Sequence, residues 1–159
     1  MKRKKLYLDT SVVSHLDQQD VPERMKETQR FWEILKTGKY DVVISEVVFS
    51  EINGCSTEKR RVLYEYVDEI SYIEYTPTKE TDNLVEQILE EKILTNKQLD
   101  DCFHIASAIL TESDVLVSWN FKHLVKAKTI EVARKVKFVN MYNGNIDIYT
   151  PNMLLEEEI

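Results

Sequence analysis

The chain has 159 residues, of which 43% are hydrophobic and 31% are charged, and its formal net charge is −7. This length suits one domain, expected over residues 1–159, and the composition is that of an ordinary globular protein. No apolar run approaches the roughly 20 residues that cross a bilayer, so a membrane-spanning protein is not expected. The negative charge argues against a protein that only coats nucleic acid.

The cysteines and the first residues bear on the compartment. The N-terminus is basic, but the apolar stretch behind it is interrupted by Asp9, which is not the pattern of a signal peptide. Cys55 and Cys102 are too few for a disulfide framework and lack metal-ligand spacing. We therefore expect reduced thiols in a cytoplasmic protein.

The first predicted element is a strand at Leu6–Leu8, an apolar run typical of a strand buried on both faces of a sheet. A helix is predicted to begin with Asp20 as its N-cap and to end at Gly38. Tyr40–Ile44 is a second buried strand, and Ser45 is placed to cap the helix that follows it.

The second half of the chain continues this alternation. Its predicted elements are, in order, a helix opened by Ser56, a strand over 72–75, a helix over 84–89, a helix opened by a capping box at Thr95–Gln98, a strand over 115–117, a helix over 127–138 and an edge strand over 146–149. Strands alternating with helices predict an α/β fold, a three-layer α/β/α sandwich around a parallel sheet of about five strands.

Four acids on two of the predicted helices can be sorted by helical face, because residues four apart are neighbours on a helix. Glu51 and Asp101 share their faces with apolar residues, so we expect them to point inward. Glu46 and Asp100 lie on polar faces, Asp100 together with His104, and we expect them to be solvated.

Asp9 directly follows the first strand and joins Glu51 and Asp101 as an acid near the predicted edge of the sheet. A carboxylate that points into a core is costly unless it is paired or binds a cation. No basic residue is obviously matched to these three, and all-oxygen ligands favour Mg²⁺ or Mn²⁺ over zinc. The alternative is that each acid caps a helix or forms a local salt bridge, as Asp9 would if Thr10 and Ser11 begin a helix.

Four segments carry a family resemblance, and they are Leu8–Ser11, Ile44–Ile52, Asp101–Ala108 and Leu116–Leu124. In order and spacing the chain resembles the PIN-domain ribonucleases, in particular the VapC-like toxins of bacterial toxin–antitoxin systems, from about Lys5 to Pro151. The resemblance implies a five-stranded parallel α/β/α sandwich whose acids bind Mg²⁺ or Mn²⁺ for the hydrolysis of RNA phosphodiester bonds.

Position by position, the resemblance implies Asp9, Glu51 and Asp101 as catalytic residues and metal ligands. The family's fourth acidic position falls on Asn120, which is also implied as a catalytic residue. An amide oxygen can still ligate a metal or a metal-bound water, but it brings no charge. Whether one or two metals bind is therefore left open.

Several neighbouring residues have both a functional and a structural interpretation. Ser11 and Ser118 fall where family members place accessory hydroxyls, and either could equally be a structural cap. For His104 and His123 a structural or phosphate-binding role is favoured, since metal-assisted hydrolysis needs no histidine base. Trp119 could stack on a base, although core packing is the better interpretation.

Six Lys and Arg residues lie between 122 and 137 against the single acid Glu131, and four more lie over 2–5. A solvated helix face with a basic strand flank would explain this pattern, and so would a rim that contacts RNA. On the nuclease interpretation, Lys122, Lys126 and Lys128 contact the RNA backbone, with the segments over 122–137 and 2–5 supplying the charge.

The sequence thus predicts a metal-dependent endoribonuclease that is the toxin of a toxin–antitoxin pair, with RNA and a cognate antitoxin protein as partners. A homodimer is left open. The alternative is a catalytically silent PIN-like domain that binds RNA or a protein partner, favoured by Asn120 and the negative charge. A haloacid-dehalogenase-type phosphatase also has an Asp after its first strand, but its second Asp would fall on Ser11, which argues against it.

Overall fold

The computed structural model describes residues 2–157. Its strands form one parallel sheet in the order β3-β2-β1-β4-β5. The strands are β1 (Lys5–Leu8), β2 (Asp41–Ser45), β3 (Ile73–Tyr75), β4 (Val115–Val117) and β5 (Asp147–Tyr149). The predicted α/β fold with a five-stranded parallel sheet is confirmed.

Helices connect successive strands, and one more helix follows β5. They are α1 (Thr10–Ser14), α2 (Pro22–Lys36), α3 (Glu46–Asn53), α4 (Thr57–Val67), α5 (Lys79–Glu90), α6 (Leu99–Leu110), α7 (Ala127–Val139) and α8 (Pro151–Glu156), with 3-10 turns η1 (His15–Asp17) and η2 (Asn96–Gln98). Ser45 caps α3 as predicted, because its hydroxyl accepts a hydrogen bond from the backbone N of Val47 at 3.1 Å. The prediction for Asp20 is wrong: α2 begins after Val21, without a side-chain cap.

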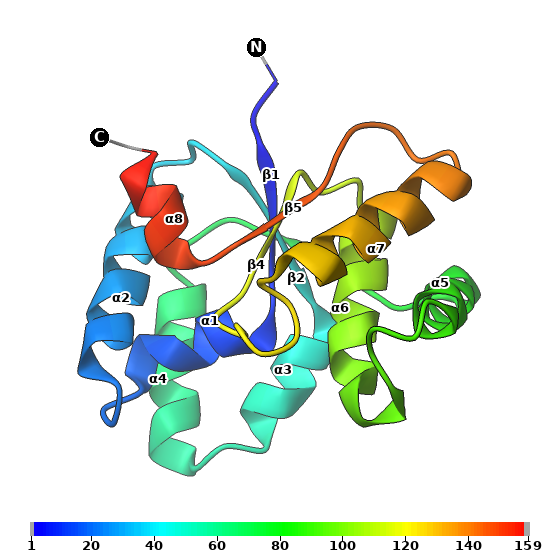
Figure 1. Cartoon of the computed structure of the whole chain (residues 1–159). Helices are drawn as coiled ribbons and strands as arrows, with labels where there is room; N and C mark the ends of the chain where they lie inside the picture. The colour runs from blue at the N-terminus through cyan, green and yellow to red at the C-terminus, as the bar shows by residue number, and fades with distance from the viewer. Residues whose placement is uncertain (1, 158–159) are drawn as a thin grey trace.

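Alternate residues of the strands face two separate hydrophobic cores, which makes the three layers. Leu6 and Leu8 of β1 pack into a core with residues of α1, α2, α3, α4 and α8. Tyr7, between them, packs into a second core with α5, α6 and α7. Figure 1 shows α2, α4 and α8 on one side of the sheet and α5, α6 and α7 on the other.

The carboxyl ends of β1 and β4 lie side by side although the two strands are far apart in sequence. The backbone N of Asp9 donates to the carbonyl O of Val117 at 3.2 Å, which ties the end of β1 to the end of β4. From β1 the chain proceeds outward to β2 and β3, whereas β4 and β5 lie on the other side, so this is the point where the strand order reverses. Open α/β sheets bind ligands at such a point.

No helix among residues 2–157 is long and apolar enough to cross a membrane.

Candidate functional site

Asp9 is buried at the carboxyl end of β1, with 4% of its surface exposed. Its Oδ1 accepts hydrogen bonds from the backbone N of Val12 at 3.1 Å and from Ser11 Oγ at 2.6 Å, so it caps α1. Burial raises the pKa of the Asp9 carboxyl because the charged form loses its water. The cap that the sequence allowed is therefore present, and it holds a buried carboxyl group at the switch point of the sheet.

Ser11 and Ser118 connect the two chain segments that follow β1 and β4. Ser11 Oγ accepts from the backbone N of Trp119 at 2.9 Å and lies 3.5 Å from Ser118 Oγ. Ser118 Oγ in turn accepts from the backbone N of Asn120 at 2.9 Å. These contacts give both serines a structural role beside Asp9.

Asn120 and Asp101 contact each other. Asn120 Nδ2 donates to Asp101 Oδ1 at 3.0 Å, and Asn120 Oδ1 accepts from the backbone N of His123 at 2.9 Å. Asp101 is partly buried at the start of α6. Its pKa is raised, mainly by burial; the charge of Asp9 adds to this rise and that of His123 opposes it. The amide of Asn120 therefore holds the Asp101 carboxylate in place by donating a hydrogen bond to it. An ionised aspartate at position 120 would have no hydrogen to donate.

Glu51 does not point into the interior as predicted, because its side chain is exposed on α3. Its pKa is nevertheless raised, first by partial burial of the carboxyl group and then by the charges of Asp100, Asp9 and Asp101. The four carboxylates therefore share one region of negative potential. Asp100 is exposed as predicted, but its effect on Glu51 makes it part of this region, which its place on a polar face did not indicate.

The carboxylates suit a divalent cation chemically but do not form a closed cage. Among residues 2–157, no three His, Cys, Asp or Glu side chains come close enough to hold a metal ion together. Mg²⁺ usually keeps several waters and binds through one or two carboxylates, so such a cage is not required. Thr10, next to Asp9, has a buried hydroxyl, and a hydrogen bond from its side chain lowers the pKa of the Glu51 carboxyl.

His104 belongs to the core. It is 3% exposed, its Nδ1 shares a hydrogen bond of 2.8 Å with the Tyr7 hydroxyl, and burial lowers its pKa to about 4. Ser107 on the same face is also fully buried, and its hydroxyl donates to the carbonyl O of Phe103 at 2.8 Å. The prediction that Asp100 and His104 lie on a solvated face is therefore right for Asp100, which is exposed, and wrong for His104, which is buried.

The basic segment is smaller than the sequence indicated. Lys122, Lys126 and Lys128, here called the rim lysines, are exposed, and none forms an ion pair within residues 2–157. The other cations are engaged elsewhere: Arg134 pairs with Asp147, Lys135 pairs with Glu91, and Lys137 is buried with its Nζ donating to the carbonyl O of Asn145.

The basic residues over 2–5 lie at the wrong end of the sheet to contact the candidate site. They precede or open β1, and a strand rises roughly 3.3 Å per residue, which puts Lys5 about 13 Å from Asp9 along the strand. Arg3 pairs with Asp41 at 3.7 Å, and Lys5 Nζ donates to the carbonyl O of Thr111 at 3.0 Å. The expected contribution of this segment to RNA binding is therefore not supported.

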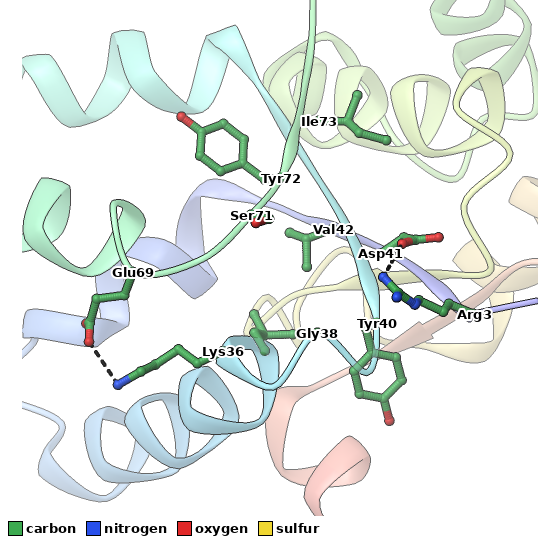
Figure 2. Close-up of a pocket in the computed structure, with 11 residues that line it drawn as sticks. Arg3, Lys36, Gly38, Tyr40, Asp41, Val42, Glu69, Ser71, Tyr72 and Ile73 are labelled. Atoms are coloured by element: carbon green, nitrogen blue, oxygen red, sulfur yellow. Dashed lines mark ion pairs between the residues drawn. The ribbon is translucent and has the colours of Figure 1, made fainter.

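A cavity of about 290 Å³ also lies away from the candidate site (Figure 2). Residues that precede β1, β2 and β3 line it, including Arg3, Gly38 and Ser71, so it lies at the amino ends of the strands. Figure 2 shows the ion pair of Lys36 with Glu69 at one side of it. Chemistry on an open α/β sheet belongs at the carboxyl ends, so this cavity is not the candidate site.

Comparison with known proteins supports the fold. No family model and no curated protein matches the sequence. A solved structure that matches is that of VapBC2 from Rickettsia felis bound to a DNA fragment from its promoter, with a TM-score of 0.54 and 15% sequence identity. The match covers 91% of this chain and 98% of that chain. At this identity the likeness establishes the fold alone, and it agrees with the PIN-like architecture.

Proposed function

We propose that this protein is a metal-dependent endoribonuclease that hydrolyses RNA phosphodiester bonds. The observation that carries the proposal is a buried carboxylate, Asp9, at the switch point of a parallel sheet, with Asp101 and Glu51 in the same electrostatic field. Burying a carboxylate is costly unless it is hydrogen-bonded, paired or bound to a cation, and a cation would stabilise Asp9 beyond its hydrogen bonds from Ser11 and Val12. The resemblance to PIN-domain ribonucleases supports the same conclusion.

In this proposal Asp9, Glu51 and Asp101 would supply carboxylate oxygens to Mg²⁺ or Mn²⁺, an ion that keeps several waters and needs only one or two of these groups as direct ligands. The bound ion would make a water molecule more acidic and offset the charge that develops on the phosphate. Asn120 orients Asp101 through the hydrogen bond of 3.0 Å, and Ser11 keeps the segments after β1 and β4 together, so both are positioning residues. The rim lysines contact the RNA backbone.

We also propose that the protein is the toxin of a toxin–antitoxin pair and binds a cognate antitoxin. The solved structure that it resembles is VapBC2, a toxin–antitoxin complex. Copurification of a tagged chain with the product of an adjacent short gene would support the pairing, and a chain that is nontoxic and unpartnered when expressed would count against it.

RNA cleavage with and without Mn²⁺ tests the enzymatic part. Asp9→Asn, Glu51→Gln and Asp101→Asn should each lower the rate by orders of magnitude. Mn²⁺ should stabilise the parent, by about 2.7 kcal/mol at a concentration of 100 times Kd, and these variants much less. Glu46→Gln, on the same helix as Glu51, and Asp82→Asn, at an exposed helix start, are matched controls that should keep activity.

Two results would contradict the proposal. Equal stabilisation of the parent and the three variants by Mn²⁺ would mean that these acids are not the ligands. RNA binding without any metal-dependent cleavage would favour the alternative, a catalytically silent PIN-like domain.

A further inference from the structure

An arginine and two aromatic rings form a cluster beside the candidate site, here called the Arg24 platform. The guanidinium carbon of Arg24 lies 5.5 Å from the centre of the Trp119 ring and 5.3 Å from the centre of the Phe121 ring. The two ring centres are 6.3 Å apart. Arg24 comes from α2 and both aromatic residues come from the segment after β4, so tertiary folding brings them together.

The two rings have different environments. Trp119 is 5% exposed, and its Nε1 donates to Thr28 Oγ1 at 2.9 Å, so it is the fixed base of the platform. Phe121 is 49% exposed and completes the platform at the surface. Phe138 is more exposed still, at 83%, but within the described residues it has neither an aromatic partner nor a cation over its ring.

The platform is adjacent to the proposed metal site along the chain and in space. Phe121 directly follows Asn120, which contacts Asp101, and Trp119 donates its backbone N–H to Ser11. Rim lysine Lys122 directly follows Phe121. A cavity of about 350 Å³, lined by residues 21–24, lies beside Arg24.

We propose that the Arg24 platform binds an unpaired base of a single-stranded RNA, with the base stacked on Phe121 and Arg24 and the adjoining phosphates near Arg24 and Lys122. Exposed aromatic faces combined with cations are the means by which proteins hold single-stranded nucleic acids. The positive charge of Arg24 complements a polyanion and would also interact with the π face of the base. This inference rests on the proposed function, because it names a substrate contact next to the proposed site.

Binding to a fluorescent oligoadenylate, compared with an abasic oligoribonucleotide of equal length, tests the stack. Anisotropy is measured in EDTA so that no cleavage occurs. Phe121→Ala should raise the Kd for oligoadenylate roughly 5- to 150-fold, the range given by a base stack of about 1 to 3 kcal/mol. The Kd for the abasic strand should not change. Phe121→Trp should keep the parent affinity, whereas Phe121→Leu should behave as Phe121→Ala, and Phe138→Ala is the matched control.

The outcomes separate this inference from the proposed function. Equal loss of affinity for both strands, or no loss for either, would overturn the stack, while Mn²⁺-dependent cleavage by the parent would leave the nuclease intact. A base-dependent loss without any cleavage by the parent would support the stack and refute the nuclease. A parent that binds neither strand would overturn the stack. Melting curves confirm that each variant folds, which is expected because Phe121 is half exposed.

Discussion

The free energy of unfolding should fall as the solution is acidified, because His104 is buried in its neutral form. Its pKa is about 4 in the folded protein, against 6.5 for a free side chain, because burial disfavours the charged ring. Between these two values the unfolded chain binds more protons than the folded one, so stability falls as the pH falls. Integrating this difference from pH 7 to pH 5 gives a loss of about 2 kcal/mol.

This loss of stability concerns the two elements that carry residues of the candidate site. The hydrogen bond between His104 and Tyr7 joins α6 to β1, and these two elements present Asp101 and Asp9. His104→Gln keeps a hydrogen-bonding group for the Tyr7 hydroxyl but has no proton to gain in this range.

Urea unfolding at pH 7 and at pH 5 measures the effect. The parent should lose about 2 kcal/mol more than His104→Gln over this interval. The two proteins share every other titrating group, so the difference between their losses reports His104 alone. An identical loss in the parent and His104→Gln would refute the assignment of a buried, neutral His104.

Three further predictions concern the candidate site. Replacing all three rim lysines with Gln should weaken RNA binding and flatten its salt dependence by roughly one unit of slope per lost contact, and an unchanged slope would show that they contact no phosphate. Asn120→Asp should tighten Mn²⁺ binding in a calorimetric titration but lower the metal-free melting temperature, because it replaces the donor to Asp101 with a second carboxylate. An unchanged Mn²⁺ affinity would place position 120 out of reach of the metal. Ser11→Ala should cost about 1 to 3 kcal/mol in urea unfolding because it leaves the backbone N–H of Trp119 without its acceptor, whereas Ser14→Ala, which removes only a 3.4 Å contact with Gln18, should cost much less.

The fold was predictable because its signals are local. Runs such as Leu6–Leu8 and Val115–Val117 can be buried on both sides only in the middle of a sheet, and that is where β1 and β4 lie. Capping residues such as Ser45 and Ser56 mark helix starts through hydrogen bonds to backbone groups two or three residues away. The error at Asp20 is one residue in size, since the helix starts with Pro22 without a side-chain cap.

The candidate site was predictable in its members but not in their environments. A helical face identifies which residues share a side and does not identify what covers that side. Glu51 shares a face with apolar residues and yet is exposed, whereas His104 shares a face with Asp100 and is buried against Tyr7. The contact of Arg24 with Phe121 joins residues far apart in sequence, so no periodicity could reveal it.

The strand order also determines when the candidate site can exist. The hydrogen bond from the Trp119 backbone N to Ser11 Oγ closes 108 residues of chain, and β1 reaches its neighbour β4 across a similar separation. A ribosome that adds about 5 to 20 residues per second needs roughly 5 to 20 s to traverse that distance. Until β4 emerges, Asp9 lacks both its hydrogen bond to Val117 of β4 and the segment that carries Asn120. The nascent chain therefore lacks an assembled site for most of its synthesis.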